Sequence, residues 1–236
     1  TEFKLDGFLN GIDPDCYNPE TDASIFSHYS IDNLEPKKRC KEELQKMFNL
    51  PVKPDTPIIA VISRLVSHKG LDLVRTVIEE VLRQDVQIII LGKGDSSYEN
   101  YFTDLARRYV GKFVAVIAFN PDLSRKIYSG ADLFLMPSKS EPCGLSQMIA
   151  SRYGTVPIVR ETGGLYDSIK PVGNGGNGFT FANYNAYDML YVIREAINCY
   201  YNKDFWPELM KRVMSVDFSW QRSAKEYEKV YGEMLK

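Results

Sequence analysis

Five apolar runs alternate with helical stretches along the middle of the chain, and this alternation limits the fold more than any other feature. Each run is continuous rather than alternately apolar and polar, which is typical of strands buried on both faces of a parallel sheet. The helical stretches between the runs supply the crossovers that parallel strands need. The pattern predicts an α/β fold, a Rossmann-like doubly wound parallel sheet. The five runs lie at residues 57–63, 86–92, 112–119, 131–138 and 155–160.

Shorter patterns flank these runs and suggest how the chain is divided. Residues 1–35 are rich in turn-forming pairs such as Asn-Gly and Asp-Pro, so we expect a linker or ordered loop there. Helix formers behind a proline predict a short helix over 36–48, and three more helical stretches follow Asn185. We therefore expect one nucleotide-binding domain over 36–218 and a separate C-terminal helix over 219–236.

The composition excludes several classes of partner. The 236 residues carry a net charge of −2, so the chain has no general surface for nucleic acid, and any phosphate site must be a small local arrangement. The four cysteines show no metal-like spacing, which favours free thiols in a reducing compartment. No apolar run approaches the length of about 18 residues that a membrane-spanning helix needs.

The stretch "SKSEPCGLSQ" places a lone carboxylate, Glu141, between the fourth apolar run and a helix start. A helix N-terminus attracts anions through its unpaired N–H groups and its dipole. Two interpretations follow from the residues. Either the carboxylate caps the turn, or the carboxylate and the helix N-terminus bind two parts of one ligand.

The other strand ends carry residues that suit the second interpretation. In an open α/β sheet, ligands bind at the carboxyl ends of the strands. Arg64 and Lys69 follow the first run, Phe119 ends the third, and Thr162–Gly164 follow the fifth. Each has a simpler explanation, because the cations could face solvent, Lys69 could bind carbonyls and Phe119 could pack in the core. Together they predict a phosphorylated ligand that carries a base.

Three segments resemble one enzyme family closely. They are "SRLVSHKG", "PSKSEPCGLSQMIASRYGTVPIVRETGGLYDSI" and "FSWQRSA", and the chain is similar to the C-terminal half of bacterial glycogen synthases and plant starch synthases from about Leu9 to its end. The resemblance implies a retaining glucosyltransferase of the GT-B arrangement, in which two Rossmann-like domains face each other. Such enzymes move glucose from ADP-glucose to the non-reducing 4-OH of an α-1,4-glucan, without a metal or other cofactor.

The resemblance also implies roles for single residues. Arg64 and Lys69 would neutralise the diphosphate and stabilise ADP as the leaving group. Phe119 would lie on the adenine, and Glu141 would bind the glucose hydroxyls. The N–H groups of Cys143 and Gly144 would face the sugar, those of Leu145 and Ser146 the phosphates, and Thr162, Gly163 and Gly164 would line the same pocket.

One departure from related enzymes bears on the mechanism. Many GT-B enzymes carry a second glutamate eight residues after the first, where this chain has Ile149. This favours the glycogen and starch synthases over the sucrose and trehalose branches. With one carboxylate at the motif, the two-carboxylate mechanism of glycosidases does not transfer. The expected step is a front-face displacement in which the departing phosphate helps to deprotonate the acceptor hydroxyl.

The 236 residues contain no counterpart of the family's amino-terminal domain. That domain carries a lysine–glycine-rich loop and most of the groove for the glucan, and the C-terminal helix of such enzymes packs on it. We therefore expect this chain to bind ADP or ADP-glucose weakly and to transfer little or no glucose. The resemblance implies the bacterial cytoplasm, or the plastid stroma for a plant or algal source.

Two alternatives to this interpretation remain at this level. The chain could belong to a transferase that uses UDP-glucose or another acceptor. It could also be a stand-alone nucleotide-sugar binding module without catalysis. Titration with ADP, UDP and GDP separates the donors, and a second glycosyltransferase half encoded upstream would exclude the module.

Overall fold

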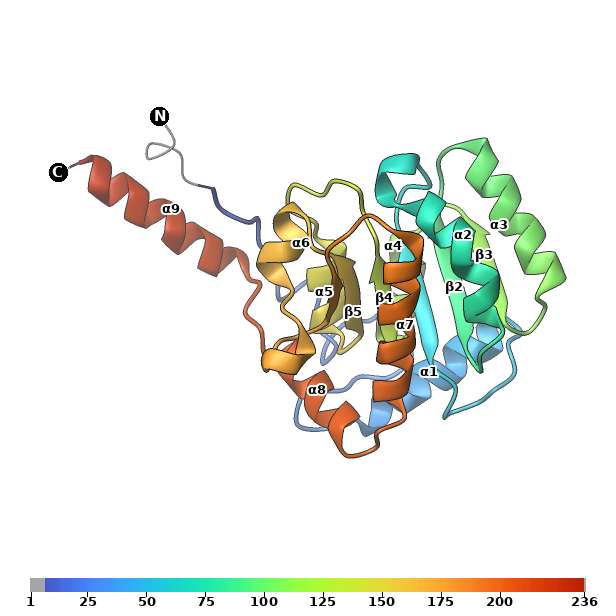
Figure 1. Cartoon of the computed structure of the whole chain (residues 1–236). Coiled ribbons are helices and arrows are strands. Elements are labelled where there is room, and N and C mark those ends of the chain that lie inside the picture. The colour runs from blue at the N-terminus through green and yellow to red at the C-terminus, as the bar shows by residue number, and fades with distance from the viewer. Residues whose placement is uncertain (1–6, 236) are drawn as a thin grey trace.

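A computed structural model describes residues 7–235 of the chain. Residues 1–6 and Lys236, the outer ends of the expected linker and C-terminal helix, lie outside this range. Within it, one parallel sheet runs through the molecule with helices on both faces (Figure 1). This confirms the α/β fold expected from the apolar runs.

The sheet has six strands, in the order β3-β2-β1-β4-β5-β6. The chain therefore winds outward from β1 to β3 on one side, and from β4 to β6 on the other. The order reverses between β1 and β4, which is the point where open α/β sheets bind ligands. The strands are β1 (Ile58–Ile62), β2 (Gln87–Gly92), β3 (Phe113–Ile117), β4 (Leu133–Met136), β5 (Val156–Arg160) and β6 (Phe179–Phe181).

The sixth strand was not expected from the sequence. β6 has only three residues, and glycines and asparagines precede it, so it lacks the long apolar run that marks the other strands. It forms because β5 offers a free edge, and it pairs there with Ile158, Val159 and Arg160.

The helices begin and end close to the bounds that the sequence suggests. Pro36 lies in the first turn of α1, where its missing N–H costs nothing, and Asn185 caps α7 through its side chain. The helices are α1 (Glu35–Met47), α2 (Leu71–Leu82), α3 (Ser96–Arg108), α4 (Pro121–Gly130), α5 (Ser146–Arg152), α6 (Gly163–Ser168), α7 (Ala186–Tyr200), α8 (Phe205–Met214) and α9 (Trp220–Met234), with short 3₁₀ turns η2 (Ser67–Lys69) and η3 (Val172–Asn174).

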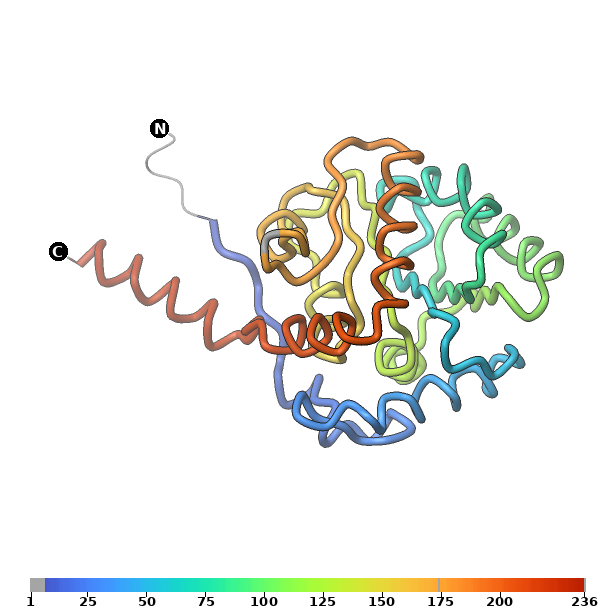
Figure 2. The backbone as a smooth tube through the Cα atoms, turned by 60° about the horizontal axis from the view of Figure 1, so that its bottom comes forward, coloured from blue at the N-terminus to red at the C-terminus, as the bar shows by residue number. Residues whose placement is uncertain are grey.

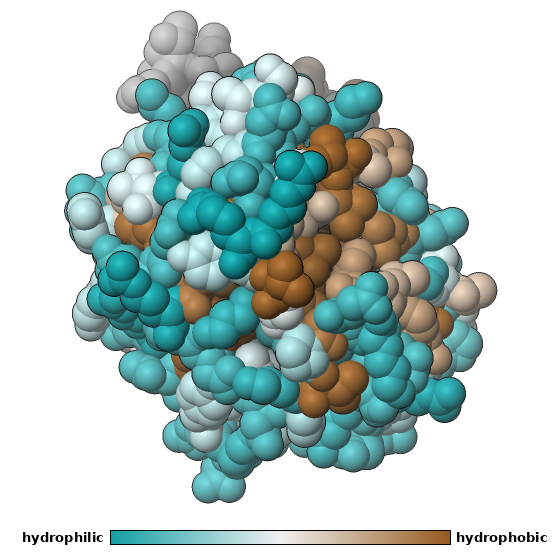
Figure 3. Space-filling view, turned by 90° about the vertical axis from the view of Figure 1, so that its right-hand side faces the viewer, coloured by the Kyte–Doolittle hydropathy of each residue, from teal (hydrophilic) through white to brown (hydrophobic). Residues whose placement is uncertain are grey.

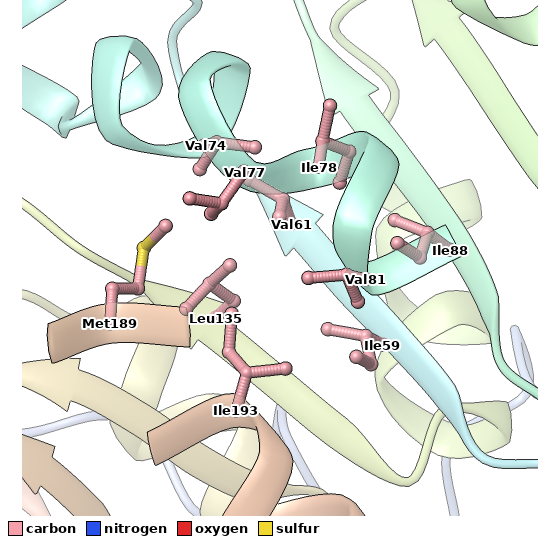
Figure 4. A pocket seen from close by; sticks show the side chains of 10 residues that line it. All are labelled: Ile59, Val61, Val74, Val77, Ile78, Val81, Ile88, Leu135, Met189 and Ile193. Atoms are coloured by element: carbon pink, nitrogen blue, oxygen red, sulfur yellow. The ribbon is translucent and has the colours of Figure 1, made fainter. Parts of the chain in front are cut away.

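Two apolar cores cover the two faces of the sheet. Along β1, Ile59 and Val61 belong to the core beneath α2, α3, α7 and α8, while Ile58 and Ala60 belong to the core beneath α1, α4 and α5. Successive residues of a central strand thus serve opposite cores, which is why the apolar runs are continuous. Figure 4 shows the first core between α2, α7 and the sheet, where apolar side chains leave a cavity of only ≈10 Å³. A space this small and apolar stays dry.

The sequence predicts strands that are buried on both faces, and the edge strand β3 differs from this expectation. Only Phe113 is buried there, and residues 114–118 are half-buried. Figure 3 looks onto the side of the molecule that carries this edge, where apolar atoms form a band between polar surfaces. Phe119 follows at the end of the strand, beyond the cover of both cores.

The two described ends of the chain leave the body of the molecule together (Figures 1 and 2). Ile12 and Ser219 form a β-bridge, and the Ile12 N–H donates to the Phe218 carbonyl over 2.7 Å. Of α9, only Ser223 is buried, and its hydroxyl donates to the Leu9 carbonyl. The division of the chain into units 1–35, 36–218 and 219–236 stays a prediction.

Candidate functional site

The loops after β1, β4 and β5 lie against one another at the carboxyl edge of the sheet, beside the reversal of strand order. The loop after β4 is joined to the loop after β1 by the N–H of Lys139, which donates to the His68 carbonyl over 2.9 Å. It is joined to the start of α6 by the Gly164 N–H, which donates to the Glu141 carbonyl over 3.0 Å. Residues that are distant in sequence are thereby brought to one site.

Glu141 lies at the centre of these contacts. Its Oε2 atom accepts hydrogen bonds from Lys69 Nζ over 2.6 Å and from Ser138 Oγ over 3.0 Å. The side chains of Lys69 and Glu141 are only 15% and 10% exposed, so water screens this ion pair weakly. Among the described residues, no main-chain N–H donates to the Glu141 carboxylate. The turn-cap interpretation is therefore wrong for this structure.

The two cations expected to bind phosphate differ in their surroundings. Lys69 neither faces solvent freely nor satisfies a carbonyl, because Glu141 holds it. Arg64 is exposed, with its Nη2 atom 3.3 Å from Nε2 of His68. Within the described residues, Arg64 has no carboxylate within ion-pair distance. One cation is thus neutralised within the protein and the other is open to a ligand.

The glycine-containing turns approach each other too closely for side chains. Gly163 adopts a left-handed φ of +46°, and a Cβ there would collide with the Glu141 carbonyl. A Cβ on Gly164 would collide with the main chain of Cys143. The turn at Cys143–Gly144 and the start of α6 therefore form one continuous surface of main chain, with Thr162 at the N-cap of α6.

Gln147 hydrogen-bonds to the main chain of this surface, a role that could not be predicted from the sequence beyond its place in the motif. The side chain is fully buried, and its Nε2 atom donates to the carbonyls of Cys143 and Gly144 and to Ser168 Oγ. Ser168 in turn donates to the Gly164 carbonyl over 2.6 Å. Gln147 Oε1 has no partner among the described residues. One amide thus ties the turn before α5 to α6.

Phe119 does not pack in the core. Its side chain is 89% exposed at the end of β3, so the core-packing interpretation is wrong. Leu145, just before α5, is also exposed, and Ser146 opens that helix without a side-chain cap on its N-terminus. These groups remain accessible at the carboxyl edge of the sheet.

A hollow of ≈490 Å³ separates the site from α9. It lies between residues 7–10, Pro142 and the start of α9, and Asp217, Arg222 and Glu226 line it. The exposed apolar side chains of α9 and the residue after it include Trp220, Tyr227, Tyr231, Met234 and Leu235. The hollow therefore borders the loop that carries Glu141.

All four cysteines are free thiols, as the sequence predicts. Across residues 7–235, no group of three or more His, Cys, Asp or Glu side chains is placed to hold a metal ion. None of the helices in that range has the length and apolarity to span a membrane.

The chain is similar to proteins of known function along nearly its whole length. Residues 42–211 match the family model described as glycosyl transferases group 1. A glycogen synthase of Bacillus cereus (strain Q1) is 51% identical over 235 residues, which are 98% of this chain and 49% of that protein. A glycogen synthase of Clostridium novyi (strain NT) is 49% identical over 234 residues, with the same two shares.

A solved structure agrees with these sequence matches. The catalytic domain of starch synthase IV from Arabidopsis thaliana, bound to ADP and acarbose, matches with a TM-score of 0.92 and 35% identity, over 98% of this chain and 49% of that one. These matches confirm the resemblance stated from the motifs. The chain spans about half the length of the relatives it matches.

Proposed function

This chain belongs to the group 1 glycosyltransferases, and from that premise we propose that it is the donor-binding half of a glycogen or starch synthase. Its ligand would be ADP-glucose, and the complete enzyme would transfer glucose to the non-reducing 4-OH of an α-1,4-glucan. The observation that carries the proposal is the contact between Lys69 and Glu141 at the reversal of strand order. In this contact, a cation that would bind phosphate and a carboxylate that would bind sugar hydroxyls lie within one hydrogen bond of each other.

The site supplies a group for each part of this donor. Arg64 is exposed and Lys69 lies in the same loop after β1, so both could approach the diphosphate and stabilise the negative charge that develops on ADP. Phe119 offers an open ring face to adenine. Glu141 is held by Ser138 in a fixed position from which its second oxygen, Oε1, can accept hydrogen bonds from glucose.

The main chain would complete the site. The N–H groups of Cys143 and Gly144 would face the sugar, and those of Leu145 and Ser146 the phosphates. Thr162, Gly163 and Gly164 would line the opposite wall, held against Glu141 and Cys143 by the contacts described above.

The transfer would proceed with retention by front-face displacement. The bond from the anomeric carbon to the ADP oxygen breaks, a bond to the acceptor oxygen forms on the same face, and the acceptor proton passes to the departing phosphate. Glu141 would orient the sugar and would not act as nucleophile, since Ile149 occupies the place where related enzymes carry a second carboxylate.

The acceptor would bind mainly to a second domain facing this one. The exposed aromatic side chains of α9 and the hollow beside Pro142 are surfaces on which such a domain would dock. On this proposal the chain alone binds the nucleotide weakly and transfers little or no glucose.

Calorimetric titration of this chain with ADP, UDP and GDP tests the proposal. We expect ADP to bind tightest, and Lys69→Ala to weaken that binding. Tighter binding of UDP than of ADP would overturn the assignment of the donor. Unchanged ADP affinity in Lys69→Ala would overturn the role of the cation.

A further inference from the structure

Arg160 ends β5 and binds the loop that carries Glu141. Its Nε atom donates to the Ser138 carbonyl over 2.9 Å, and its Nη2 atom donates to the Lys139 carbonyl over 2.6 Å. A planar guanidinium can make these two bonds side by side, because its donors form a rigid fork. The third nitrogen, Nη1, lies 3.4 Å from the Ala182 carbonyl. All three nitrogens are thus directed at the main chain.

Tyr184 supports the guanidinium from the other side. The Cζ atom of Arg160 lies 5.5 Å from the centre of the Tyr184 ring, within the range of a cation–π contact. The Tyr184 hydroxyl donates to Asp72 Oδ1 over 2.5 Å, which ties the ring to the first turn of α2. Burial raises the pKa of the Tyr184 phenol, so the hydroxyl stays a neutral donor. Arg160 is therefore held by contacts within the protein.

Ser138 connects this arrangement to the carboxylate. Its main-chain carbonyl accepts from Arg160, and its hydroxyl donates to Glu141 Oε2 over 3.0 Å. Ser138 is fully buried, so solvent cannot replace either bond. The next residue, Lys139, is held on both sides, by its N–H to His68 and by its carbonyl to Arg160. A shift of Arg160 would release the segment that sets the direction of Glu141.

We propose that Arg160 is a positioning residue for Glu141 and thereby determines how well the site recognises the sugar of its donor. It acts through the carbonyls of Ser138 and Lys139 and touches no part of the donor itself. The inference rests on the proposed function, in which Glu141 binds the glucose.

The test uses the ratio of two dissociation constants, that of ADP-glucose over that of ADP, measured by calorimetry on this chain. A purely structural loss would weaken both ligands alike and leave the ratio unchanged. Arg160→Lys keeps the charge but cannot make both bonds. We expect the ratio to rise about three- to tenfold, the loss of part of one charge-assisted hydrogen bond to the sugar.

Arg152→Lys is the matched control. Arg152 also donates from two nitrogens, to the Tyr17 carbonyl and to Asn18 Oδ1, at the far end of α5 from Glu141. It should leave the ratio unchanged. Should Arg160→Lys fail to fold, Ser138→Ala provides the same test, because it removes the last bond of the connection and should raise the ratio as well.

The outcomes separate this inference from the proposed function. The inference alone would be overturned if Arg160→Lys and Ser138→Ala both kept the ratio of the unmodified chain while Glu141→Gln raised it. An unchanged ratio in Glu141→Gln would overturn the inference together with the sugar role of Glu141. Absence of ADP binding to the parent chain would overturn the proposed function and, with it, everything that rests on it.

Discussion

Replacing Glu141 by glutamine should strengthen the binding of ADP, although Glu141 belongs to the site. Lys69 donates to Glu141 over 2.6 Å, and a diphosphate must compete with the carboxylate for this ammonium group. Glutamine has nearly the same shape and can still accept one hydrogen bond from Lys69, but it carries no charge. The diphosphate of ADP would then compete with a weaker hydrogen bond for the Lys69 ammonium group.

The size of the effect follows from the kinds of hydrogen bond involved. A charge-assisted bond contributes about 1.5–3 kcal/mol, whereas a neutral acceptor in the same place contributes about 1 kcal/mol. The difference, about 0.5–2 kcal/mol, corresponds to an increase of about two- to thirtyfold in ADP affinity. The low exposure of both side chains keeps water from erasing it.

Calorimetric titration of this chain with ADP measures the change. Glu20→Gln is the control, since Glu20 is exposed and its removal alters the net charge by the same amount. A double-mutant cycle adds a further comparison, because the gain from Glu141→Gln should be smaller in a Lys69→Met background, where no ammonium is left to release. Equal or weaker ADP binding in Glu141→Gln, with thermal stability unchanged, would refute the competition for Lys69.

Two further predictions concern the stacking of adenine on Phe119 and the buried Lys37. Phe119→Ala should lower ADP affinity about fivefold, which is the lower end of base–aromatic stacking, and should leave the affinity for pyrophosphate unchanged. An equal loss of affinity for both ligands would contradict the stacking role. Burial lowers the pKa of Lys37 from 10.5 to about 8, so between these pH values the unfolded chain holds a proton that the folded chain has released, and stability rises with pH. From pH 8 to 10.5, the free energy of unfolding measured with denaturant should rise by about 3 kcal/mol more in the unmodified chain than in Lys37→Met. If this free energy changes with pH in the same way in both proteins, the lowered pKa of Lys37 is contradicted.

The central part of the fold could be predicted because each strand of a buried parallel sheet carries its own continuous apolar run. Every strand from β1 to β5 is long and apolar enough to be recognised on its own. β6 could not be predicted in this way, since its three residues become a strand only beside β5. The exposure of β3 and Phe119 depends likewise on strand order, which the sequence pattern does not contain.

The same distinction holds for the candidate site: the positions of its residues could be predicted, but their contacts could not. Residues at strand ends could be located, because the ends of parallel strands meet at one edge. Their partners could not, since Lys69 and Glu141 are 72 positions apart in the sequence and nothing in the pattern shows that the two touch. Arg160 looked like the last residue of a strand, and its role became visible only when the carbonyls of Ser138 and Lys139 were placed beside it.

The pairing of Ile12 with Ser219 has a mechanical consequence. Any body attached through both residues 7–11 and α9 would be joined to the sheet by two crossings of polypeptide, tied to each other where they leave it. A single crossing can swivel about its own axis, but two tied crossings resist twisting and permit bending about the line that joins them. Movement of such a body would reduce to bending about that line, so its distance from Glu141 could change without the body twisting about the direction of the two crossings.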